Sequence, residues 1–293
     1  MDDREDTDLI ESQDASLAPG VKVTRRMFAA GGGVGAGFAL LVQPVSAATI
    51  TTDAKGLTAG MVMVDGADRK IPAYRAYPAG KTRLPVVVII HEIFGLHEHV
   101  KDLCRRLAHQ GYYAICPDLY VRYGDATTVT DVQALMGGIV AKVTDPIMKG
   151  DLDGAVKFAA SEKANTAKLG VTGFCWGGRQ TWKYTAMNPA VKAGVAWYGP
   201  LVGNPPPSPT DLAGQIKGRV LGLYGAKDMG IPLESVTGMR AALTAAGDTE
   251  SKIIVYQNSP HGFNADYRPS YVEADAKDGW AKMVAWFKAH GVA

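Results

Sequence analysis

Cys175 is the residue whose setting most suggests chemistry. It lies in Gly173-Phe174-Cys175-Trp176-Gly177-Gly178, between a strand-like run at 168–172 and a helix-like run at 179–187. A Gly-x-nucleophile-x-Gly turn of this kind holds a reactive side chain above a sheet, and the free N–H groups of the following helix favour a thiolate. A lone cysteine is often a buried apolar residue, and glycine-rich turns also bind phosphates. The motif therefore needs partners elsewhere in the chain.

Two further residues could complete a catalytic triad. Asp228 follows a predicted strand at 219–224, and His261 follows the last predicted strand, at 252–257. Carboxyl ends of parallel strands meet at one edge of a sheet, and the chain order nucleophile, acid, histidine is that of α/β-hydrolases. We expect Cys175 to attack a carbonyl carbon, His261 to take the thiol proton and later activate water, and Asp228 to orient the imidazole. Taken singly, Asp228 could be a turn residue and His261 a surface histidine.

An oxyanion hole needs two N–H donors near such a nucleophile. We predict the backbone N–H of Trp176, directly after the nucleophile, as one donor. Ile93, in the loop His91-Glu92-Ile93-Phe94-Gly95 after the predicted central strand, is the candidate for the other.

Composition limits the class of protein. The chain has 293 residues, of which 47% are hydrophobic and 20% charged, and its net charge is +2. This profile is typical of a soluble globular protein, and no basic block resembles a nucleic-acid footprint. We expect a monomer that does not bind nucleic acid.

The first 47 residues read as a targeting segment. Residues 1–21 are acidic and poor in large apolar groups, and Thr24-Arg25-Arg26-Met27-Phe28 is a twin-arginine pattern. The apolar run at 29–42 is short and glycine-rich, and small residues at 45–48 suit a signal peptidase. We expect export to the periplasm or beyond, with no stable membrane span in the mature protein. A disordered tail or an uncleaved anchor are the alternatives.

Residues 48–293 are expected to form one domain. Strand-like segments at 61–64, 71–77, 85–90, 112–116, 168–172, 191–197, 219–224 and 252–257 alternate with helix-like segments at 98–109, about 129–163, 179–187, 232–246 and about 270–289. This alternation predicts an α/β-hydrolase fold, with a mostly parallel sheet of about eight strands and helices on both faces. The first two strands are expected at the edge, and a break is expected near Asp145-Pro146. Cys104 and Cys116 could pair, although two separate buried thiols fit a helix and a strand better.

Several segments together resemble the dienelactone hydrolase (carboxymethylenebutenolidase) family across roughly residues 60–290. They are the cysteine turn, the His91–Gly95 loop, Pro117-Asp118-Leu119-Tyr120, Asp228 and His261-Gly262-Phe263. The resemblance implies hydrolysis of ester or lactone bonds of small, carboxylate-bearing molecules through a thiol-ester intermediate. It implies no metal or organic cofactor. Another triad hydrolase, such as a thioesterase, peptidase or acyltransferase, or a non-catalytic binding protein on the same fold, is also open.

The same resemblance assigns further roles. It makes Glu92 the base that takes the thiol proton when substrate arrives, the alternative being a structural partner of a nearby arginine. It assigns substrate binding to Tyr120 and to arginines that clamp a carboxylate, with Arg122 at one matching position. The second arginine of the family falls soon after the histidine. Here it is displaced to Arg268, which either substitutes for it or faces solvent.

Overall fold

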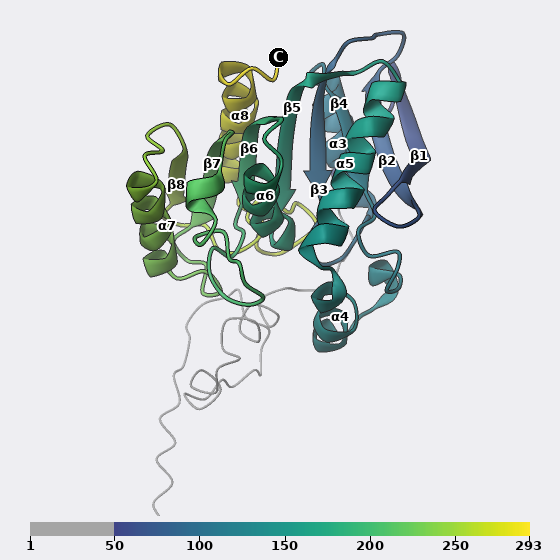
Figure 1. The fold of residues 1–293 in the computed structure, drawn as a ribbon. Helices are drawn as coiled ribbons and strands as arrows, with labels where there is room; N and C mark the ends of the chain where they lie inside the picture. The colour runs from purple at the N-terminus through teal and green to yellow at the C-terminus, as the bar shows by residue number, and fades with distance from the viewer. Residues whose placement is uncertain (1–49) are drawn as a thin grey trace, which may run out of the picture.

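The computed structural model describes residues 50–293, which form layers of helices around one eight-stranded sheet (Figure 1). The strand order is β1-β2-β4-β3-β5-β6-β7-β8. The strands are β1 (Leu57–Asp65), β2 (Lys70–Pro78), β3 (Pro85–Ile90), β4 (Tyr113–Pro117), β5 (Asn165–Phe174), β6 (Val191–Trp197), β7 (Arg219–Gly225) and β8 (Lys252–Tyr256). The predicted segment 1–47 lies outside the described residues.

Pairing confirms the mostly parallel sheet. The β1–β2 and β2–β4 pairs are antiparallel, and every other neighbouring pair is parallel. One expectation was wrong in detail, because β2 is not an edge strand. It lies between β1 and β4, so β1 alone forms that edge.

Helices cover both faces of the sheet, with α5 and α6 on the face turned to the viewer and α3 and α8 behind (Figure 1). The helices are α3 (Glu98–His109), α4 (Val132–Gly138), α5 (Asp145–Ser161), α6 (Trp176–Met187), α7 (Leu233–Ala245) and α8 (Glu273–Ala289), with short 3₁₀ turns at Ala126–Thr128, Val140–Lys142 and Ala213–Gln215. The break predicted near Asp145-Pro146 is the start of α5, because proline suits the first helical turn.

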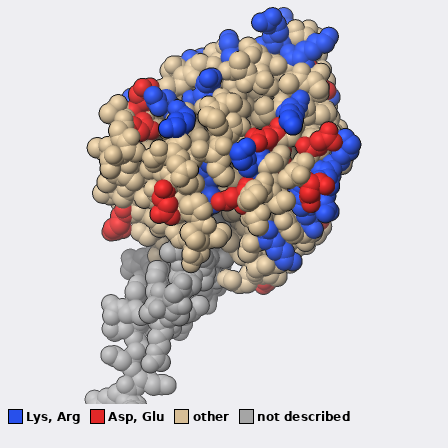
Figure 2. All heavy atoms as spheres, viewed as in Figure 1, with Lys and Arg blue, Asp and Glu red and all other residues tan. Residues whose placement is uncertain are grey.

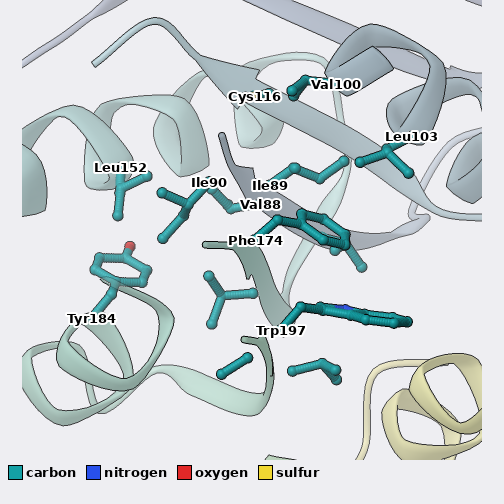
Figure 3. Packing of buried hydrophobic residues seen from close by; sticks show 14 of the residues in the cluster. Val88, Ile89, Ile90, Val100, Leu103, Cys116, Leu152, Phe174, Tyr184 and Trp197 are labelled. Atoms are coloured by element: carbon teal, nitrogen blue, oxygen red, sulfur yellow. The ribbon is translucent and has the colours of Figure 1, made fainter. Parts of the chain in front are cut away.

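The core is built on β3. Val86, Val87, Val88, Ile89 and Ile90 are fully buried, as expected for a central strand covered on both faces. Figure 3 shows Val88, Ile89 and Ile90 of this strand between helices. Leu152 of α5 and Tyr184 of α6 lie on one side of them, and Leu103 of α3 lies on the other. Phe174 and Trp197, the last residues of β5 and β6, stack with ring centroids 5.4 Å apart. The central strands are therefore held rigidly where they end.

Strand register brings the carboxyl ends of the parallel strands level. Ile90 pairs with Gly173, Phe174 with Trp197, and Gly225 with Tyr256. The residues that follow these strands leave the sheet along one edge, and they include His91, Cys175, Tyr198, Asp228 and His261. This edge is where an open parallel sheet places its site.

Charged side chains of both signs are interspersed on the face shown in Figure 2. In the described part of the chain, no helix has the length and apolar character needed to cross a membrane. The expectations about export concern residues that the structure does not describe.

Candidate active site

Cys175 lies in a strained turn between β5 and α6. Its φ is 59° and its ψ is −120°, a left-handed conformation that residues with a side chain rarely adopt. The turn is fixed on both sides, because the Cys175 N–H donates to the Trp197 carbonyl (3.0 Å) and the Arg179 N–H donates to the Cys175 carbonyl (3.2 Å). The side chain is completely buried.

Close backbone approach explains the glycine at position 177. A Cβ atom there would lie 2.2 Å from the Ile90 carbonyl oxygen and 2.6 Å from that of His91. Helix α6 therefore packs against the end of β3 with no room for a side chain. This contact sets the distance between the cysteine turn and the His91–Gly95 loop.

The two predicted N–H donors meet at the sulfur of Cys175. The backbone N–H groups of Trp176 and Ile93 both interact with this sulfur and favour its thiolate form. Burial nevertheless raises the pKa of the Cys175 thiol far above its usual value, and the charge of Glu92 raises it further, whereas Arg268 opposes the rise. The resting side chain is therefore a neutral thiol that lies where two N–H donors converge.

Asp228 and His261 form a buried hydrogen-bonded pair. The Nδ1 atom of His261 lies 2.7 Å from Oδ2 of Asp228, and Oδ1 of Asp228 accepts from the Gly230 N–H at 2.9 Å. Because an ionised carboxylate only accepts, Nδ1 of His261 carries the hydrogen and Nε2 is the basic nitrogen. The ring of Tyr198 lies 5.1 Å from that of His261. Burial raises the pKa of Tyr198 well above its usual range, and the charges of Glu92 and Cys175 add to the rise. Tyr198 thus connects this pair with the surroundings of the cysteine.

Glu92 is buried, and its charge acts on the thiol of Cys175. Its Oε2 accepts a hydrogen bond from the hydroxyl of Tyr267 and lies 3.9 Å from Nε2 of His97. That second distance would be an ion pair only with a protonated histidine, and burial lowers the pKa of His97 to about 3, so His97 is neutral. Oε1 of Glu92 has no hydrogen-bond partner among the described residues. A carboxylate oxygen that is free of other hydrogen bonds can accept a proton from a group that approaches it.

The three predicted substrate-binding residues lie in different settings. Tyr120 is buried, its ring lies 5.1 Å from that of Trp176, and its hydroxyl has no partner in the described structure. Arg268 is also buried rather than turned to solvent, and its charge acts on Cys175 and Tyr198. Tyr120 therefore packs against the residue that follows the cysteine, and Arg268 acts on the cysteine through its charge.

Arg122 is engaged elsewhere. Its guanidinium makes a two-pronged contact with the carboxylate of Asp151 (2.6 and 2.7 Å) and a further one with Asp68 (2.6 Å). These contacts tie the β1–β2 turn to α5. A substrate carboxylate would have to displace Asp151 to reach this arginine.

Sequence reasoning missed four residues that shape this site: His91, His97, Tyr198 and Tyr267. Tyr198 could have been found, because it directly follows a predicted strand. His91 donates from Nδ1 to the Glu92 carbonyl (2.8 Å) and accepts at Nε2 from the Leu119 N–H (3.1 Å), which fixes the loop that carries Ile93. Burial lowers the pKa of His91, so it acts here as a neutral anchor.

The described residues offer no evident metal centre. Between residues 50 and 293, no group of three or more histidine, cysteine, aspartate or glutamate side chains is arranged to hold a metal ion. Cys104, Cys116 and Cys175 are all free and buried, so the expectation of separate thiols at 104 and 116 is confirmed.

The strand order, the parallel sheet and the cysteine turn between β5 and α6 define an α/β-hydrolase fold. The sequence model of the dienelactone hydrolase family matches residues 71–291, and the chain belongs to that family. A relative from Methylorubrum extorquens, named "Putative carboxymethylenebutenolidase", is 51% identical over 284 residues, covering 95% of this chain and 97% of the relative. One of the same name from Salmonella typhimurium is 48% identical over 260 residues, covering 87% of this chain and 96% of the relative.

A solved structure agrees with these relatives. The crystal structure titled "Putative Dienelactone Hydrolase", from Klebsiella pneumoniae, has a TM-score of 0.77 and 48% sequence identity to this chain. The match covers 79% of this chain and 98% of the other. The chain is therefore a hydrolase of the carboxymethylenebutenolidase-like class with an α/β-hydrolase fold.

Proposed function

We propose that this hydrolase cleaves ester or lactone bonds of small, carboxylate-bearing substrates, with Cys175 as nucleophile and His261 and Asp228 as its partners. The observation that carries the proposal is the meeting of two backbone N–H donors, from Trp176 and Ile93, at a cysteine held in a strained strand-to-helix turn. The buried His261–Asp228 pair at the same edge of the sheet supports it.

Acylation would begin when the substrate carbonyl enters beside the sulfur. Glu92, through its unoccupied Oε1, takes the thiol proton as the sulfur attacks the carbonyl carbon. The N–H groups of Trp176 and Ile93 hold the negative oxygen of the tetrahedral intermediate. The C–O bond then breaks, the leaving oxygen takes the proton from Glu92, and a thioester remains on Cys175.

Deacylation would use the histidine. Asp228 holds Nδ1 of His261, so the basic Nε2 removes a proton from water as the water oxygen attacks the thioester carbonyl. Collapse of the second tetrahedral intermediate releases the carboxylic acid. The leaving sulfur takes back the proton from His261, and the enzyme returns to its starting state.

Arg268 is the proposed partner of the substrate carboxylate. It is buried and close enough for its charge to act on Cys175, and its guanidinium fork suits a carboxylate. Arg122 is a weaker candidate because Asp68 and Asp151 already engage it. Tyr120, with a buried hydroxyl that lacks a partner among residues 50–293, offers a further polar contact.

Activity of the Cys175→Ala variant tests the proposal. Wild-type protein should hydrolyse a p-nitrophenyl ester and dienelactone, and the variant should lose at least about 10³-fold in kcat, as loss of a nucleophile requires. Equal turnover by both proteins would contradict it. Product analysis with added acyl acceptors distinguishes a hydrolase from an acyltransferase.

Export by the twin-arginine segment and the monomeric state stay predictions.

A further inference from the structure

A cluster of buried polar side chains adjoins Glu92 and has no part in the proposed mechanism. Its members are Tyr267, His97, His99 and Asp266. All four side chains are buried, and they come from the loop before α3, the first turn of α3 and the loop after β8. Buried polar groups are costly unless each is held in place, so a connected cluster of this size beside a reactive thiol calls for a function.

A continuous series of contacts connects α3 with Glu92. Arg106 of α3 pairs with Oδ2 of Asp266 (2.5 Å), and Oδ1 of Asp266 lies 3.1 Å from Nδ1 of His99. The rings of His99 and His97 lie 4.9 and 5.1 Å from the ring of Tyr267. His97 and His99 also stack on each other, so Tyr267 packs against a pair of rings, and its hydroxyl reaches Oε2 of Glu92.

We propose that Tyr267 is a positioning residue for Glu92. Its hydrogen bond occupies Oε2, leaves Oε1 as the oxygen that meets the Cys175 thiol proton, and restrains the carboxylate as a base in the resting enzyme. This inference rests on the role proposed above for Glu92.

The direction of the hydrogen bond supports this role. Burial and the charge of Glu92 both raise the pKa of Tyr267 well above its usual range, so the phenol keeps its proton and is the donor. A donated hydrogen bond stabilises the ionised carboxylate and weakens its attraction for a further proton. The contacts of the Tyr267 ring with His97 and His99 restrain the ring that carries this hydroxyl.

The consequence concerns the proton shared by Glu92 and Cys175. Two negative charges in one buried pocket are costly, so near neutral pH the thiol proton leaves mainly by passing to Glu92. Removing the Tyr267 hydroxyl makes Glu92 a stronger base, and a larger fraction of the cysteine becomes thiolate. The titratable groups that face Glu92 from all neighbouring elements are Cys175, His91, His97, Tyr198 and Tyr267, and the Arg268 charge acts on several of them.

The test compares alkylation of Cys175 by iodoacetamide in wild type, Tyr267→Phe, Glu92→Gln and the double variant, at neutral pH, with the labelled residue identified by mass spectrometry. We expect Tyr267→Phe to react about tenfold faster than wild type, the factor given by one pKa unit of relative proton affinity. In the Glu92→Gln background the same substitution should have no effect. With an ester substrate, the acid limb of the kcat/KM profile of Tyr267→Phe should move to higher pH.

A matched control is available. Tyr113 is also buried and donates to a glutamate, Glu162, at 2.5 Å, and Tyr113→Phe should leave the alkylation rate of Cys175 unchanged. The inference is overturned if Tyr267→Phe reacts no faster than wild type, or if it changes the rate by the same factor in both backgrounds, as a merely structural defect would. Alkylation needs no substrate. Absence of ester turnover in wild type would therefore count against the proposed function and leave this test intact.

Discussion

The substitution Gly177→Ala tests how closely α6 must approach β3. The added Cβ would lie 2.2 Å from the Ile90 carbonyl oxygen, about 1 Å closer than an ordinary carbon–oxygen contact allows. Because the contacting atoms belong to the backbone of the central strand, no side-chain rotation relieves the clash, and the N-terminus of α6 must move. Such overpacking costs typically 1–3 kcal/mol, which lowers the melting temperature of a domain this size by about 2–12 °C.

The same movement carries the Trp176 N–H away from the sulfur of Cys175. A displacement of about 1 Å at a reacting centre costs on the order of 10²-fold in rate. The Gly177→Ala substitution should therefore affect both thermal unfolding and ester hydrolysis. We expect a lower melting temperature together with a disproportionate loss of kcat.

Gly238→Ala provides the matched control. Gly238 is exposed in α7, and a Cβ there would meet no atom within 4 Å. Alanine should stabilise this helix by about 0.5–1 kcal/mol and leave activity unchanged. Close packing of α6 on β3 would be refuted if Gly177→Ala also melted at or above the wild-type temperature and kept full activity.

Two other predictions concern buried charges. Because His97 has a pKa of about 3 when folded and about 6.5 when unfolded, the unfolded chain binds the extra proton, and stability falls as pH drops from 6.5 towards 3. Urea unfolding at pH 7 and pH 5 should show that the free energy of unfolding of wild type falls by about 2 kcal/mol more than that of His97→Gln. Equal falls in the two proteins would refute a buried neutral histidine. Arg268→Met should raise KM about tenfold for a carboxylate-bearing ester and leave KM for a neutral ester unchanged. Arg122→Met should lower the melting temperature without this charge-specific effect, and the reverse pattern would exchange the two assignments.

The order of elements could be predicted well because local patterns encode it. The β-branched run at 85–90 indicated a strand buried on both faces, and β3 is such a strand. The apolar spacing at 98–109 indicated a helix, and α3 has the same bounds. The pattern could not predict which strands are neighbours in the sheet. The segment at 71–77 became β2, an inner strand, because β1 pairs along its outer side, and strand pairing is a long-range choice.

Types and spacing of reactive residues were sufficient to nominate Cys175, Asp228 and His261, since their places after strands follow from local signals. Types and spacing were not sufficient to predict the protonation states and hydrogen-bond partners of these residues. Only the packed structure buries the thiol within reach of the Glu92 charge and so raises the pKa of Cys175. Only the packed structure places Asp228 in hydrogen-bond contact with His261.

For the arginines, the sequence determined the charge and the tertiary structure decided the partner. Arg122 matched a family position but is taken up by Asp151 across 29 residues of chain, whereas the displaced Arg268 is buried near the sulfur. Tyr267, 175 residues from Glu92, carries no local signal for its hydrogen bond. By itself the sequence thus determined which groups are available and which strand each one follows. Which buried charges face one another depends on contacts between distant segments, because burial strengthens electrostatic interactions only where the folded chain excludes water.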